Sequence, residues 1–254
     1  MCNEIARRIA LGQLRDDWSE LKIPLVFPEG LPNLAPEESI RITDPALILR
    51  AATPGPEGDD AAPAVEAVVR RWSWPGQGGR PVYNYRSEGR ALANAADARA
   101  PAAPQSHASP GGSGRGGSGR CLVVVDAFFE FTDPEPDLLG PDLLGDTPKK
   151  TRKTKWRFVD AHHPSGSPQG DASRGWGWFC IAGVWRAEPK LGEGRTAEAF
   201  SLLTCEPGPD VAPYHHRQVV VPPRAQWGGW LDGSLPAAEV CRPAAAGTFR
   251  VERA

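Results

Sequence analysis

The sequence has few cysteines, no long hydrophobic run and almost no net charge, and each scarcity excludes a class of protein. Its 254 residues hold five cysteines, an odd number with wide spacing and no C-x-x-C pair. This usage argues against a disulfide framework and against a zinc site, and it favours a reducing compartment. We therefore expect no bound metal and no cofactor.

No stretch approaches the roughly 18 apolar residues that a membrane-spanning helix needs. The first residues, MCNEIARRIALGQ, lack the hydrophobic region and cleavage pattern of a signal peptide. We expect a cytoplasmic protein with no membrane partner, associated with the nucleoid when it binds DNA. The formal net charge of -2 gives no overall attraction to nucleic acid, so a DNA site would have to be a local groove.

Short extended segments dominate the chain. The pattern predicts one amphipathic helix over residues 3–21 and strands at these places: 46–51, 65–74, 82–86, 121–131, 155–159, 178–185, 200–205 and 217–222. Strands outnumber helices without regular alternation, which favours an α+β fold over a parallel α/β sheet. Residues 90–119 are rich in Ala, Pro, Gly and Ser and are predicted to form a flexible insertion. We expect one domain over 1–235, followed by a C-terminal tail, 236–254.

Cys2 follows the initiator methionine directly. Removal of Met1 would leave a free α-amine and a thiol on neighbouring carbons, a pair that reacts with an aldehyde to form first a Schiff base and then a thiazolidine ring. An α-amine has a pKa near 8, so much more of it is neutral at pH 7 than of a lysine amine. Taken alone, a cysteine at this position is a weak signal, because reactivity depends on its surroundings.

Several short motifs follow Cys2 in a fixed order. They are N-L-A-P (33–36), R-W-S-W-P (71–75), Y-N-Y-R-S-E (83–88), C-L-V-V-V-D-A-F-F-E-F (121–131), I-A-G-V-W (181–185), F-S-L-L-T (200–204) and H-H-R (215–217). Together they resemble the SRAP family, named for the SOS response-associated peptidase domain. The resemblance extends from Cys2 to about Trp230 and depends on the order of the motifs rather than on any one of them.

The resemblance implies a single α+β domain with a curved, barrel-like, mainly antiparallel β core, flanking helices and a positively charged cleft for single-stranded DNA. It implies that the protein captures abasic sites covalently, as a thiazolidine crosslink through Cys2, and removes its own Met1. The site residues that it implies are Cys2 as nucleophile, Asn84 to orient it, Glu130 and His215 as catalytic groups, Arg86 at the phosphates and Trp72 beside the strand. Arg217, in the same H-x-R motif as His215, is a further candidate for DNA binding.

The chemistry asks for such residues independently. A partly buried carboxylate on a rigid strand, as Glu130 would be, can take a proton from the attacking amine and deliver one to the departing hydroxyl. The alternative is a solvent-facing glutamate at a strand edge. His215 titrates near neutrality and could help to open the sugar ring. A surface histidine is the alternative there, and His216 is an adjacent rival.

The candidate binding residues also have ordinary explanations. Asn84 could orient the N-terminal amine or occupy a turn. Arg86 could contact a phosphate or form a surface ion pair. Trp72 and Trp74 share one strand face and could stack an unpaired base, although core packing is the commoner fate of tryptophan.

The basic run 149–157 is better explained as a solvated hairpin than as a nucleic-acid site, and His162–His163 has no partners at metal spacing. Where the family usually has an arginine soon after the cysteine, this chain has Glu4, which could weaken phosphate binding. We expect a monomer whose partner is single-stranded DNA containing abasic sites, with lyase activity as a side reaction of the Schiff base. A thiol peptidase acting in trans, or a non-covalent reader of modified or single-stranded DNA, are the alternatives.

Overall fold

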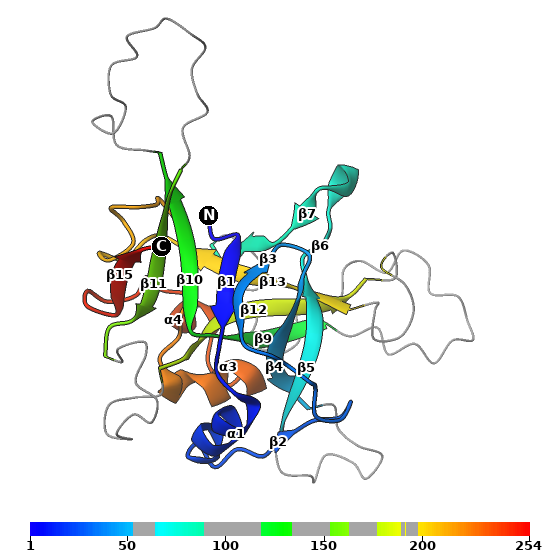
Figure 1. Cartoon of the computed structure of the whole chain (residues 1–254). Coiled ribbons are helices and arrows are strands. Elements are labelled where there is room, and N and C mark those ends of the chain that lie inside the picture. Colours follow the sequence, from blue (N-terminus) through cyan, green and yellow to red (C-terminus); the bar gives the residue numbers. More distant parts are fainter. Residues whose placement is uncertain (53–63, 89–117, 134–152, 163–176, 189–190, 192–197) are drawn as a thin grey trace, which may run out of the picture.

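The computed structural model describes residues 1–52, 64–88, 118–133, 153–162, 177–188, 191 and 198–254. The chain is mostly β structure in one domain, with a large curved sheet and few helices (Figure 1). The predicted fold class is therefore confirmed. The insertion predicted at 90–119 falls outside the described residues except for its last two positions, which already belong to a strand.

One sheet has five strands in the order β15-β11-β10-β1-β3. Each of its neighbouring pairs is antiparallel. Their bounds are β1 (Glu4–Arg7), β3 (Glu37–Arg41), β10 (Ala127–Thr132), β11 (Thr154–Asp160) and β15 (Phe249–Arg253). The chain thus begins in the interior of this sheet, because β1 lies between β10 and β3.

The second sheet has the order β14-β13-β12-β9-β4-β5-β2, and β8 pairs with β13 beside it. Its strands are β2 (Leu25–Val26), β4 (Pro45–Ala51), β5 (Val65–Trp72), β8 (Asn84–Arg86), β9 (Ser118–Val125), β12 (Phe179–Ala187), β13 (Glu198–Cys205) and β14 (Gln218–Val219). An additional parallel pairing joins β13 to β5 through Ala199↔Arg71 and Phe200↔Trp72. This pairing closes β13, β12, β9, β4 and β5 into a barrel.

A buried ion-pair network spans this closure. Arg50 of β4 contacts Glu66 at 3.1 Å and Glu198 at 3.0 Å, and Arg70 of β5 also pairs with Glu198. The guanidinium of Arg70 reaches Glu29 at 2.7 Å as well. Because the backbone pairing between β5 and β13 involves only two residue pairs, these side chains supply further links across the barrel closure.

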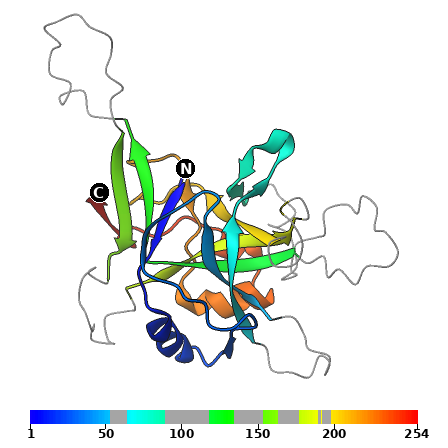
Figure 2. The ribbon, with the colours of Figure 1, turned by 45° about the vertical axis from the view of Figure 1, so that its right-hand side comes forward.

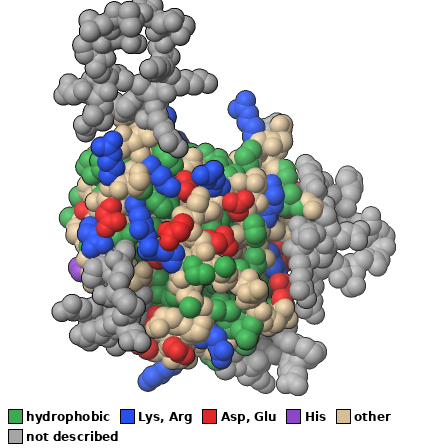
Figure 3. All heavy atoms as spheres, viewed as in Figure 1, with side chains coloured by type: hydrophobic (Ala, Val, Ile, Leu, Met, Phe, Trp, Pro, Cys, Tyr) green, Lys and Arg blue, Asp and Glu red, His purple; other side chains and the backbone are tan. Residues whose placement is uncertain are grey.

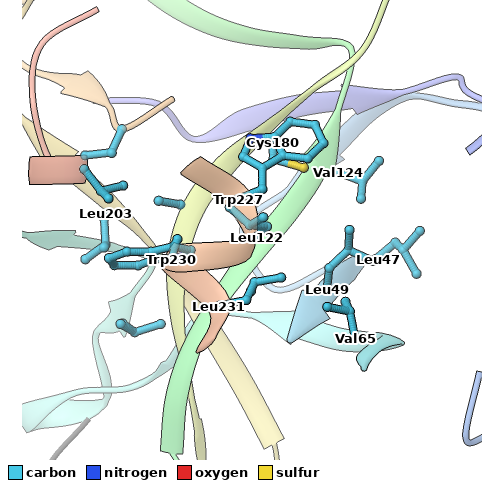
Figure 4. Close-up of a cluster of buried hydrophobic side chains, with 14 of the residues drawn as sticks. Leu47, Leu49, Val65, Leu122, Val124, Cys180, Leu203, Trp227, Trp230 and Leu231 are labelled. Atoms are coloured by element: carbon cyan, nitrogen blue, oxygen red, sulfur yellow. The ribbon is translucent and has the colours of Figure 1, made fainter. Parts of the chain in front are cut away.

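The barrel strands have two apolar faces, since successive side chains alternate. One set, with Leu122 and Val124 of β9, packs with Trp227, Trp230 and Leu231 of helix α3 (Trp227–Asp232), as Figure 4 shows. Helix α1 (Leu11–Ser19) adds Leu14 and Trp18 to the same cluster. The alternate set, with Val123 and Val125, packs against the five-stranded sheet.

The remaining elements are short. They are β6 (Trp74–Pro75) and β7 (Pro81–Val82), which form a hairpin around the 3-10 turn η1 (Gln77–Gly79), the 3-10 turn η6 (Arg224–Gln226) and helix α4 (Ala237–Val240). Figure 2 shows the β6–β7 hairpin projecting from the barrel near the N-terminus.

Two sequence predictions need correction. The helix predicted over 3–21 is limited to Leu11–Ser19. Residues 4–7 form the strand β1 instead, and all four of them are buried. The segment 236–254 is not a tail: it contributes α4 and the edge strand β15, which pairs with β11 over five residues. Tertiary packing determines the structure of both segments, because the local periodicity of the sequence does not show that these residues are buried.

Candidate functional site

Cys2 lies just before β1 and is buried, with 1% of its surface exposed. Its Sγ donates to the carbonyl of Glu4 at 3.4 Å, and burial raises the pKa of the thiol well above its ordinary value. The side-chain amide of Asn84 donates to the Cys2 carbonyl at 2.8 Å. Hydrogen bonds therefore hold Cys2 at both its side chain and its backbone, directly before a strand whose position the sheet fixes.

Glu130 lies on β10, the strand that pairs with β1, and is 1% exposed. Its Oε2 lies 3.2 Å from the Met1 amine, and the backbone N–H of Cys2 is near enough to its carboxylate to lower its pKa. Burial raises the pKa of Glu130 to about 7, against the opposing effect of the nearby N-terminal charge. Because such an acid is present in both protonation states near neutrality, it can accept a proton and return it.

His215 lies in the loop between β13 and β14. Its Nε2 is 2.5 Å from the Met1 amine, and its Nδ1 lies 2.9 Å from the carbonyl oxygen and 3.0 Å from the amide nitrogen of Arg217. Burial, followed by the N-terminal charge, lowers the pKa of His215. A neutral ring with its proton on Nδ1 would donate to the Arg217 carbonyl and leave Nε2 free to accept from the amine.

The loop that carries His215 is tightly packed. The His215 amide donates to the Val211 carbonyl at 3.0 Å, and a Cβ placed on Gly208 would lie 2.1 Å from the Ala244 carbonyl oxygen. Gly208 is therefore required for this close approach of the two backbones. The imidazole of His216 stacks on that of His215 with 4.3 Å between ring centroids, which further fixes the ring.

Glu130 and His215, which are distant in the sequence, thus converge on the N-terminal amine, and Asn84 holds the neighbouring Cys2 carbonyl. Two acceptor atoms in this cluster, Oε1 of Glu130 and Oδ1 of Asn84, are buried and have no hydrogen-bond partner. Buried acceptors without partners are costly in folded proteins and mark places where a ligand or a moving proton can be accommodated. The arrangement has the groups needed for amine chemistry at the N-terminus.

A cleft of about 580 Å³ opens from this cluster. It is lined by Met1, Asn84, Tyr85 and Arg86, by the β6–β7 hairpin with Trp74, and by Arg186 and Glu188 at the end of β12. Arg86 is exposed at its edge. The cleft therefore connects the N-terminal amine with an exposed guanidinium suited to a phosphate.

Two of the residues that were predicted to contact DNA are instead engaged within the protein. Trp72 is 0% exposed, and its indole N–H donates to the Tyr83 carbonyl at 2.9 Å, so its ring packs in the core. Arg217 is 8% exposed and makes a two-pronged contact with Glu88, with both N–O distances at 2.8 Å. This guanidinium lowers the pKa of Glu88 and also donates to the Thr204 carbonyl, which ties β13 to the His215 loop.

The acidic residue near the nucleophile is neutralised within the protein. Glu4 is 5% exposed, and its carboxylate contacts Nζ of Lys155 at 2.6 Å. Lys155 also lies 3.9 Å above the ring of Phe129. In the described part of the basic run, Arg157 pairs with Asp126 at 3.7 Å, and Figure 3 shows basic and acidic side chains interleaved over this face. Glu4 therefore presents no isolated negative charge beside Cys2.

Comparison with known proteins identifies the family. The family model described as SOS response associated peptidase (SRAP) matches residues 1–253. The chain belongs to the SRAP family. Membership supports a function connected with DNA damage and suggests a peptidase-like enzyme.

Two solved structures share the SRAP fold of this chain at low sequence identity. A phage-related protein from Bordetella bronchiseptica is 17% identical with a TM-score of 0.55, and covers 100% of this chain and 94% of its own. A protein from Bacteroides thetaiotaomicron is 13% identical with a TM-score of 0.54, and covers 99% of this chain and 91% of its own. No curated protein matches the chain.

In the described residues, no three His, Cys, Asp or Glu side chains are grouped in a way that could hold a metal ion. None of the helices in these parts of the SRAP chain is long and apolar enough to cross a membrane.

Sequence reasoning missed one part of the site. Arg186 and Glu188, which line the far end of the cleft, follow the I-A-G-V-W motif directly, but nothing in their spacing indicates a site. The signal that could have found them is the continuation of strand alternation past Trp185, which places both residues on one strand face.

Proposed function

We propose that this SRAP protein captures abasic sites in single-stranded DNA by forming a thiazolidine through Cys2 after Met1 has been removed. The observation that carries the proposal is the convergence of Glu130 and His215 on the N-terminal amine, at 3.2 and 2.5 Å. In addition, the nitrogen that becomes the free amine of Cys2 lies near the Glu130 carboxylate, where as a backbone N–H it lowers the pKa of Glu130. Loss of Met1 would leave that nitrogen beside the carboxylate and free the space at the mouth of the cleft.

The reaction begins with hydrolysis of the Met1–Cys2 peptide bond, which consumes one water and releases methionine. His215 then transfers a proton during opening of the abasic sugar to its aldehyde form. The Cys2 amine attacks C1′, and Glu130 takes a proton from the nitrogen and returns one to the hydroxyl, which leaves as water. This exchange suits an acid with a pKa of about 7.

Ring closure completes the product. The Cys2 thiol adds to the C=N bond, so sulfur binds C1′ and the thiol proton ends on nitrogen. No oxidant or reductant is needed. Because the thiolate is the nucleophile, the thiol, whose pKa is raised by burial, must give up its proton as sulfur attacks, and the imine nitrogen accepts it. The same pKa disfavours a resting thiolate, and hence the alternative of a thiol peptidase acting on peptides in trans.

Binding of the DNA strand would use the cleft beside the amine, with Arg86 at a phosphate. Of the three residues predicted to contact DNA, Arg86 alone is exposed, since Trp72 is packed in the core and Arg217 is engaged with Glu88. A strand entering the cleft would bring its sugar toward the site now occupied by Met1. Non-covalent reading of DNA without capture remains the competing function.

The test is a denaturing gel with an abasic single-stranded oligonucleotide and protein whose intact mass shows that Met1 is absent. We expect a shifted, denaturation-resistant band that Cys2→Ala abolishes. Cys241→Ala is the matched control, because Cys241 is also a free cysteine but follows α4 and packs against the cluster of helix α3, whereas Cys2 packs in the other cluster, and it should crosslink like the wild type. An equal shift with Cys2→Ala would refute the proposal, whereas salt-sensitive binding without any crosslink would favour the non-covalent reader.

A further inference from the structure

The far end of the cleft has features that the capture reaction does not use. There, Trp74 of the β6–β7 hairpin is 5% exposed and packs against Tyr85 with 6.3 Å between ring centroids. The Arg186 guanidinium lies 4.4 Å from the Trp74 ring centroid. This end of the cleft is therefore built on aromatic rings that hold a charged side chain in place.

Arg186 is also fixed by an acid. Its NH2 group donates to Glu188 at 2.6 Å, and the side chains of Arg186 and Glu188 are 35% and 9% exposed. Nε of Arg186 is buried and has no hydrogen-bond partner. The cleft thus ends in a prepositioned donor and a mostly buried acceptor, one beside the other.

This pair suits a nucleobase better than a phosphate. A phosphate would meet the negative carboxylate of Glu188 next to the guanidinium, and Glu188 is the one acidic side chain among the described residues that line the cleft. A base edge is neutral and carries donors and acceptors side by side. An arginine and a carboxylate are the side chains that read such edges by paired hydrogen bonds.

We propose that this end of the cleft binds an unpaired base next to the abasic site, and that Arg186 and Glu188 select guanine. The proposal rests on the proposed function. Guanine presents two adjacent N–H donors, at N1 and N2, which match one carboxylate, and its O6 on the same edge accepts from the guanidinium. Cytosine, adenine and thymine lack two adjacent N–H groups of this kind.

The experiment measures crosslinking rates for single-stranded oligonucleotides in which the base on the 5′ side of the abasic site, and then on the 3′ side, is varied through all four bases. On one of the two sides, we expect guanine to be favoured over thymine by roughly fivefold or more at subsaturating DNA. Glu188→Gln should bring this ratio to within about twofold, because an amide cannot accept from both guanine N–H groups. The far-UV circular dichroism spectrum of Glu188→Gln should match that of the wild type, which shows separately that the variant is folded.

Glu252→Gln is the matched control. It removes the acid of another Arg–Glu pair two residues apart on a strand, Arg250–Glu252 at 2.8 Å, on edge strand β15. It should keep the full guanine preference. Equal rates for all flanking bases, or a guanine preference that survives Glu188→Gln, would overturn the subsite while leaving the capture reaction intact. Absence of a crosslink with every oligonucleotide would instead defeat the proposed function.

Discussion

Replacing Glu130 with glutamine should stabilise the protein at alkaline pH. The pKa of Glu130 is raised from 4.5 to about 7, chiefly by burial, so the folded state disfavours the carboxylate. Each pKa unit corresponds to about 1.4 kcal/mol, which gives a cost of about 3 kcal/mol in free energy of unfolding when the group must ionise. Glutamine has nearly the same shape and carries no charge to bury.

The pH window follows from the sign of the shift. Below pH 4.5 the group is protonated in both states and costs nothing. As pH rises toward 7, the unfolded state releases its proton first, so the stability of the wild type falls relative to that of Glu130→Gln. Above about pH 7 the difference should reach its full value, on the order of 2–3 kcal/mol in favour of the variant.

The assay is urea denaturation of both proteins at pH 4.5, 6 and 8, with intact mass to establish that both have the same N-terminus. Glu252→Gln, at a surface ion pair, should follow the wild type throughout. Parallel stability curves for wild type and Glu130→Gln across this range would refute the reasoning that burial holds a proton on this carboxyl. If Glu130→Gln also loses crosslinking, the ionised carboxylate of Glu130 that destabilises the fold is also the group that the reaction needs.

Four other changes separate catalysis, DNA binding and stability. His215→Gln should slow single-turnover crosslinking by roughly 10²-fold or more with little change in DNA affinity, and an unchanged rate would exclude His215 from proton transfer. Arg86→Ala should weaken non-covalent binding and reduce the slope of log affinity against log salt by about 1, whereas Arg217→Ala should leave that slope unchanged and lower the midpoint of thermal unfolding by breaking the pair with Glu88. Trp72→Ala should cost about 3–5 kcal/mol of stability in urea titrations, because the ring is fully buried, and a loss of DNA affinity without loss of stability would contradict its core position.

The sequence predicted the fold class and most strands because barrel strands leave a local pattern. The run Cys121–Phe131 is apolar enough to indicate buried strands, and the structure divides it between β9 and β10. The β1 strand could not be predicted in this way. Residues 4–7 (EIAR) lack the alternation of a half-buried strand, and their burial depends on partner strands about 30 and 120 residues away.

The candidate site was predictable as a set of residues but not as a geometry. Chemistry and motif order singled out Cys2, Asn84, Glu130 and His215, whose roles stay predictions. The structure adds that Glu130 and His215 contact the Met1 amine and that Asn84 contacts the Cys2 carbonyl. Pattern alone could not show that Trp72 and Trp74 are both buried, or that they pack in different clusters, since alternation puts them on one face without saying what covers each. Nor could the pattern show that Lys155 of β11 neutralises the charge of Glu4 in β1, because the two residues are far apart in the sequence.

The position of β1 bears on when methionine is cleaved. The amine leaves the ribosome first, yet its pocket needs Glu130 and then His215. At about 5–20 residues per second, roughly 10–40 seconds of synthesis separate residue 2 from residue 215. Throughout that interval the terminus is an unfolded, accessible end, so an aminopeptidase can act before any pocket exists. The mature polypeptide would then fold directly around its newly exposed reactive end.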